Sequence, residues 1–220
     1  GRCATGLPDY FLADLDGASA DLDEALRWNP SLFVARMNRG FLRSLRNDHS
    51  GAVDDFSRAA EIDPTHHLPR FNRGVEFNSL GKTAQAMEEF RAAATLAPTR
   101  PEPHRSIGDL LSAQGDVDGA IAAWSEAIRV DPKYVEPYAN RGNAYARRGE
   151  HAPAIADYAV VLSIEPANYL VMLYRGVEYA RSGRNPAAIA DLERALTIAP
   201  ADWVYCANVE QTLKQLLGSE

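Results

Sequence analysis

The sequence is short of several features that would define a class of function. Its 220 residues include only two cysteines, Cys3 and Cys206, too few for a zinc site built from clustered cysteines. No apolar run reaches the roughly 18 residues of a membrane-spanning helix, because Arg, Asp, Glu or Lys interrupts every such stretch. A basic excess is also missing, since the net charge is −7. We therefore expect no nucleic-acid partner and no membrane insertion.

The first residue is Gly1 rather than Met, from which we expect a processed product or a piece of a longer protein. Any leader would then already be removed. The sequence does not specify the compartment; the cytoplasm is slightly favoured, and a periplasmic or secreted location is the alternative.

A period of 34 residues runs through the chain and is the main feature that is present. Four kinds of residue keep this step: Pro30, Pro64, Pro98, Pro132, Pro166 and Pro200; Gly6, Gly40, Gly74, Gly108, Gly142 and Gly176; Ala18, Ala52, Ala86, Ala120, Ala154 and Ala188; and the bulky Leu22, Phe56, Phe90, Trp124, Tyr158 and Leu192. Four positions in one register, without an insertion, predict a repeat protein.

Each period contains two apolar-periodic stretches of helical length around a short turn. Turn glycines such as Gly81 and Gly115 can end the first helix in a left-handed conformation. The 34-step prolines then end the second helix. Small residues such as Gly74 and Ala86 let the two helices approach closely. The pattern predicts helical hairpins near 33–64, 67–98, 101–132, 135–166 and 169–200.

The run Asn-Arg-Gly at 38–40, 72–74 and 140–142, with the alanine, aromatic and proline positions above, resembles the tetratricopeptide repeat. The resemblance covers residues 31–200 as five repeats. It implies an all-α fold, a right-handed α-solenoid of stacked antiparallel helix hairpins, in which stacking buries what one hairpin alone leaves exposed.

The two ends depart from the repeat. Residues 1–30 are expected to form a degenerate repeat, in which Pro8 leaves room for only a short first helix. Residues 201–220 are expected to form a capping helix, with Glu210 in place of the glycine because no second helix follows. Leu213, Leu216 and Leu217 should pack inward, and Gln211, Lys214 and Gln215 should face solvent. An array of this length should keep Cys3 and Cys206 too far apart for a disulfide.

No constellation of residues predicts catalysis. Gly81-Lys82-Thr83 imitates the end of a phosphate-binding loop, but Glu76 stands where the loop requires glycine. His66 and His67 are adjacent and do not share a helix face, so a loop is favoured over a metal site. The acidic pairs at 54–55 and 88–89 are expected on solvated helix faces. We expect no catalytic residue, no metal and no cofactor.

The resemblance also implies that the first helices line a concave face where partners bind. Helical phase then selects the candidate contact residues, which are apolar in the first two repeats and the last and charged or polar in the middle: Val34, Met37, Phe41, Leu45, Leu68, Phe71, Val75, Asn78, Arg105, Asp109, Asn143, Arg147, Leu170, Leu173 and Val177. Exposed apolar residues on such a face indicate binding. The alternative is that residues 1–30 fold over Phe41 and Phe71.

These features favour a non-catalytic scaffold that binds a protein or peptide. The chaperone-tail clamp of the family is not expected, because its polar positions hold Met37, Phe41, Leu68 and Asn72, and most of the clamp is therefore missing. Two alternatives are a nucleic-acid-binding helical-repeat protein, which the acidic charge disfavours, and an accessory region of a larger enzyme. The partner is not specified, and a homo-oligomer stays open.

Overall fold

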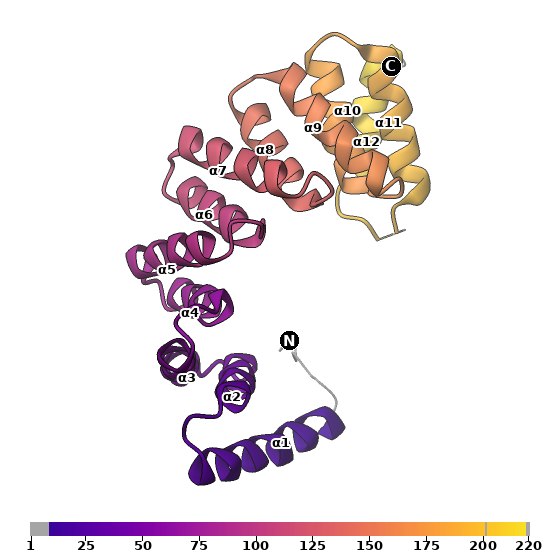
Figure 1. The fold of residues 1–220 in the computed structure, drawn as a ribbon. Helices are drawn as coiled ribbons and strands as arrows, with labels where there is room; N and C mark the ends of the chain where they lie inside the picture. The colour runs from indigo at the N-terminus through magenta and orange to yellow at the C-terminus, as the bar shows by residue number, and fades with distance from the viewer. Residues whose placement is uncertain (1–8, 201, 219–220) are drawn as a thin grey trace. The chain divides into compact units, whose positions relative to one another are not determined.

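A computed structural model describes residues 9–200 and 202–218, with side chains from residue 15 onward. Within these residues the chain forms α-helices and no strand (Figure 1), which confirms the all-α fold of helical hairpins. The helices are α1 (Asp9–Trp28), α2 (Phe33–Leu45), α3 (His49–Ile62), α4 (His67–Ser79), α5 (Thr83–Leu96), α6 (Glu102–Ala113), α7 (Val117–Val130), α8 (Val135–Arg147), α9 (His151–Ile164), α10 (Tyr169–Arg181), α11 (Asn185–Ile198) and α12 (Cys206–Leu217).

The chain divides into two compact units, residues 1–98 and 99–220, which we call unit 1 and unit 2. In unit 1 the hairpins α2–α3 and α4–α5 pack on each other through α3 and α4, and α1 packs on α2. In unit 2 the hairpins α6–α7, α8–α9 and α10–α11 pack in sequence order, and α12 packs on α11 (Figure 1). None of the described helices combines the length and apolar character needed to cross a membrane.

Each hairpin turn depends on one residue in the left-handed region. Gly81, Gly115, Gly149 and Gly183 have φ between 71° and 84°, which confirms the predicted glycine turns. Asn47 occupies the same register in the first full hairpin and adopts φ 60°, which asparagine tolerates better than most residues.

The N-terminal segment differs from the expectation of a short first helix. Gly6 and Pro8 lie outside the described residues, and α1 runs unbroken from Asp9 to Trp28. The register of the turn residue falls on Ala13, which strongly favours helix and does not favour a left-handed φ. The helix therefore continues where the other repeats turn.

A buried ion pair links the two helices of four hairpins. The first-helix arginine and the second-helix acid are 16 residues apart, and the pairs are Arg39–Asp55, Arg73–Glu89, Arg141–Asp157 and Arg175–Asp191. The remaining hairpin has Ile107 and Ala123 at these positions, so both partners are replaced together.

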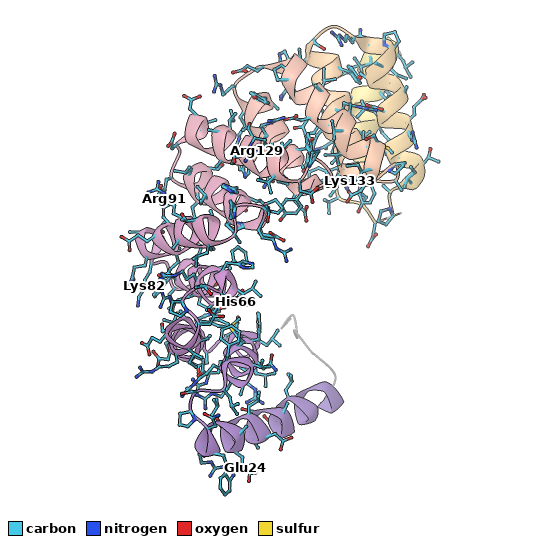
Figure 2. All side chains as sticks on the ribbon, viewed as in Figure 1. Glu24, His66, Lys82, Arg91, Arg129 and Lys133 are labelled. Carbon is cyan, nitrogen blue, oxygen red and sulfur yellow. The ribbon has the colours of Figure 1, made fainter. Side chains whose placement is uncertain are left out.

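These pairs correct the expectation that both acidic pairs lie on solvated faces. Asp54 and Glu88 are exposed, but Asp55 is completely buried and the Glu89 side chain is 13% exposed. A surface pair such as Arg129–Glu126 (Arg129 is labelled in Figure 2) is far more exposed and should contribute little to stability.

The repeat glycine of the first helix faces the bulky residue of the second helix. A Cβ added at Gly74 would lie 2.8 Å from the Phe90 ring and 3.2 Å from Cβ of Glu89, so the close neighbour is Phe90 rather than the predicted Ala86. Glu210, at the same register in α12, is exposed. Leu213 is buried and Leu216 packs on the core, whereas Leu217 is 57% exposed because the helix ends there.

Gly74→Leu should lower the free energy of unfolding of unit 1 by about 1–3 kcal/mol, because the new side chain must displace the Phe90 ring. Glu210→Leu is the matched control and should change the stability by less than about 0.5 kcal/mol. Urea denaturation measures both. Equal losses for the two variants would contradict this account of the cap.

Candidate protein-binding surfaces

Unit 2 contains a groove of about 1150 Å³ on the side of its first helices. The lining residues come mainly from α6, α8, α10 and α12, with Trp124 and Tyr158 contributed by second helices. Five predicted contact residues lie in this groove, namely Asp109, Asn143, Arg147, Leu173 and Val177. The groove is therefore built from side chains that are far apart in the sequence and recur at repeat spacing.

A fixed polar cluster forms one part of the groove around Asp109. One carboxylate oxygen of Asp109 accepts hydrogen bonds from Trp124 Nε1 at 3.0 Å and Asn140 Nδ2 at 2.9 Å, and the other accepts from Arg105. Because a carboxylate only accepts, Asn140 must donate with its amide nitrogen. The amide oxygen of Asn140 is then available to accept a hydrogen bond from a ligand. Arg105 reaches the groove through Asp109 and does not line it.

Asn143 is held by a buried tyrosine. The Tyr158 hydroxyl donates to Asn143 Oδ1 at 2.7 Å. Burial raises the pKa of Tyr158 well above its ordinary value, and the charge of Glu178 raises it further, so the phenol stays protonated. The amide nitrogen of Asn143 is consequently left to donate to a ligand.

Arg147 and Arg181 line the groove, and they differ in whether a carboxylate forms an ion pair with them. Glu178 is buried, faces His151 Nδ1 at 2.6 Å and accepts from Arg181 at 2.8 Å. Arg147 is exposed and contacts Ser112 Oγ at 3.4 Å. No carboxylate of residues 15–200 or 202–218 forms an ion pair with Arg147, so its positive charge is uncompensated.

An apolar wall on α10 faces the groove together with Tyr205. Leu173 and Val177 are partly buried, and Tyr174 is 39% exposed with its ring centre 6.1 Å from that of Tyr158. Sequence reasoning missed Tyr174, Tyr205, Asn140 and Asn208 as groove residues. Asn140 and Asn208 are 68 residues apart, two periods of the repeat, and this recurrence by itself marks the repeat rather than a groove.

Unit 1 presents exposed apolar residues on α2 and α4, which we call the α2–α4 apolar face. They are Val34 at 67% exposure, Phe41 at 46%, Leu45 at 62%, Leu68 at 40% and Val75 at 40%. The described part of α1 thus leaves Phe41 open to solvent. The polar Asn78 is exposed as well.

Met37 does not belong to this face, which corrects its prediction as a contact residue. It is 6% exposed and packs with Ala52, Phe56 and Ala59, because its unbranched side chain fills the space above the two alanines. Phe71 is partly buried against Phe90, with ring centres 5.6 Å apart. Leu170 is 37% exposed and lies beside the loop after α9, outside the groove of unit 2.

The same register holds different chemistry in the two units. Where unit 2 has Asp109, Trp124 and Asn140, unit 1 has Phe41, Phe56 and Asn72. The Asn72 amide nitrogen is buried and finds no acceptor among the described residues. One repeat frame therefore carries a polar surface in unit 2 and an apolar surface in unit 1.

Comparison with known families decides the identity of the repeat. A TPR repeat model matches residues 108–149, and a tetratricopeptide repeat model matches residues 70–100. The chain contains tetratricopeptide repeats. A search of curated proteins found no match.

Solved structures of several other proteins share the fold. MamA is 24% identical over 75% of this chain and 90% of its own, with a TM-score of 0.66. YrrB, described as a TPR protein with an unusual peptide-binding site, is 19% identical over 86% and 97%, with a TM-score of 0.67. PilF of Pseudomonas aeruginosa is 18% identical over 90% and 87%, with a TM-score of 0.72.

The matches to tetratricopeptide-repeat models support, in general terms, a protein-interaction scaffold. Across residues 15–200 and 202–218, no group of three or more His, Cys, Asp or Glu side chains is placed to hold a metal ion. The expectation that Cys3 and Cys206 do not form a disulfide involves Cys3, which lies outside the described residues. Cys206 is a free, partly exposed thiol whose Sγ lies 3.8 Å from Glu210 Oε1.

Proposed function

We propose that unit 2 binds an extended segment of a partner protein in its groove, as a scaffold and not as a catalyst. The observation that carries the proposal is that one groove combines hydrogen-bonding amides with an apolar wall. Asn140 and Asn143 offer an acceptor and a donor whose orientations are fixed by Asp109 and Tyr158. An extended peptide exposes both main-chain donors and acceptors, and it can satisfy such amides.

The apolar wall adds the second requirement for affinity. Tyr174 and Tyr205 are 39% and 45% exposed in the groove, and aromatic side chains that become buried on binding commonly dominate interface energetics. The peptide-binding site named for YrrB gives the same fold a precedent. The ligand expected here has apolar side chains that contact α10 and a main chain that contacts α8.

Tyr174→Ala should weaken peptide binding roughly thirtyfold, which corresponds to a loss of about 2 kcal/mol from one hot-spot aromatic. A random peptide library displayed against the intact chain supplies ligands, and calorimetric titration measures their affinity. Tyr179→Ala is the matched control, because Tyr179 lies on the same helix outside the groove, near the Arg175 guanidinium. Equal effects of the two substitutions, or enriched peptides that bind elsewhere, would reject the groove.

The α2–α4 apolar face is a second candidate contact for a partner protein. Val34 and Leu45 are 67% and 62% exposed, and two such side chains on one helix are more than scattered surface residues. Phe41→Glu in the same titrations separates the two sites. A peptide that loses affinity with Phe41→Glu but not with Tyr174→Ala binds unit 1.

A further inference from the structure

We infer that the segment bound by unit 2 carries an acidic side chain that pairs with Arg147. This inference rests on the proposed peptide-binding function and specifies the chemistry of its ligand. It follows from the ion pairs in the groove, from the position of Arg147 among the hydrogen-bonding amides, and from the apolar wall that α10 contributes to the same groove.

Arg147 is a groove arginine without an ion-pair partner among the described residues. Asp109 is compensated by Arg105, and Glu178 is compensated by Arg181. Arg147 is left with the hydroxyl of Ser112 at 3.4 Å, which is a long contact for a charged donor. A guanidinium presents a planar fork of donors that matches a carboxylate in two parallel hydrogen bonds. A ligand carboxylate would thus complete the pairing in the groove.

The neighbouring residues indicate how such a ligand lies. Arg147 follows Asn143 by one turn on α8, so both side chains face the same side of the helix and both line the groove. A main chain held by the Asn143 amide therefore brings its adjacent side chain to Arg147. The carboxylate of an acidic residue at that position needs no rearrangement of α8.

The apolar wall adds a second element to the expected ligand. Leu173 and Val177 line the same groove from α10, and α9 packs on both α8 and α10. An extended chain advances about 3.3–3.6 Å per residue. The expected ligand has an acidic residue and an apolar residue a few positions apart.

The groove extends past Arg147 in both directions, from Ser112 on α6 to Thr212 on α12. A bound chain can therefore continue on either side of the pairing residue. This favours a side-chain carboxylate within a segment over the carboxylate at a chain end.

The test is a display of random twelve-residue peptides, internal to a carrier protein, against the intact chain and two variants. The wild type should enrich Asp or Glu a few positions from an apolar residue. Arg147→Glu should abolish that preference and favour Lys or Arg instead. Arg184→Glu is the matched control, because Arg184 is exposed, outside the groove and without a carboxylate partner among the described residues. It should enrich the same peptides as the wild type.

Titration of the best wild-type peptide gives the second readout. Its affinity should fall at least tenfold with Arg147→Glu and by less with Arg147→Lys, which keeps the charge but loses the fork. Replacing the acidic residue of the peptide by its amide should cause a similar loss in the wild type and almost none in Arg147→Glu. Amidation of the peptide C-terminus should have no effect.

The outcomes separate the inference from the proposed function. Peptides that bind the groove without an acidic preference would overturn the inference and leave the proposed function standing. Loss of binding on C-terminal amidation would overturn it in favour of a chain-end carboxylate. Failure of every peptide to respond to Tyr174→Ala would overturn the proposed function and the inference together.

Discussion

Asp55→Ala should lower the free energy of unfolding of unit 1 by about 3–5 kcal/mol, the range typical for breaking a buried ion pair from one side. The Asp55 carboxylate is fully buried and accepts hydrogen bonds from Arg36 at 3.0 Å and from Arg39 at 2.7 and 2.8 Å. Without it both guanidinium groups stay largely buried, Arg36 loses its counter-charge, and Arg39 keeps only the more exposed Asp23. Hydrogen exchange of the α2 and α3 amides reports the change in unit 1.

Lowering the pH provides a control for the Asp55→Ala prediction. Burial raises the pKa of Asp55, but the hydrogen bonds from Arg39 and Arg36 outweigh it, and the net pKa lies below the ordinary value. A group with a lowered folded pKa stabilises the protein above its unfolded pKa of about 3.9 and loses that contribution as the pH falls through the folded value. The stability difference between wild type and Asp55→Ala should therefore shrink below about pH 4. A difference that stays constant down to pH 2 would show that the ion pair is not its cause.

Tyr158→Ala should destabilise unit 2 by about 3–5 kcal/mol, as expected for truncating a fully buried aromatic side chain. Tyr158 is 1% exposed and packs in the cluster that includes Val161, Met172 and Leu192. The same substitution removes the hydroxyl that orients Asn143, so peptide affinity should fall as well. Urea denaturation and peptide titration measure the two effects.

Tyr158→Phe separates packing from orientation. The ring remains, so the stability should fall by only about 1 kcal/mol, the net contribution of one hydrogen bond. Asn143 is then free to rotate, and the affinity for the peptide should decrease although the core is intact. If Tyr158→Phe binds the peptide as tightly as the wild type, Asn143 does not depend on this hydroxyl.

The hairpins could be predicted from the sequence because their determinants are local and repeated. A glycine or asparagine at each turn and a proline after each second helix specify the same backbone five times over. The prediction was less accurate for α1. Ala13 stands at the register of the turn glycines, and this indicates a continuous helix more clearly than the position of Pro8 indicates a short one.

The contact surfaces were predicted less well because helical phase gives the direction of a side chain but not its neighbours. Met37 has the phase of a surface residue, yet the small Ala52 and Ala59 leave space that it fills. The groove of unit 2 depends on hydrogen bonds between repeats, such as Asn140 to Asp109, which no single repeat reveals. The buried ion pairs could have been found, because arginine and its acid change together to Ile107 and Ala123.

The spacing of these side-chain contacts also has a consequence for how the chain folds. The arginine–acid pairs close segments of 16 residues, and contacts between neighbouring hairpins such as His49–Glu76 and Arg147–Ser112 close segments of 27 to 35 residues. Short closures cost little chain entropy, and proteins rich in local contacts fold fast. A hairpin leaving the ribosome can therefore form its own ion pair before the next hairpin has been synthesised. The growing chain then exposes little more than one unstacked apolar face at a time.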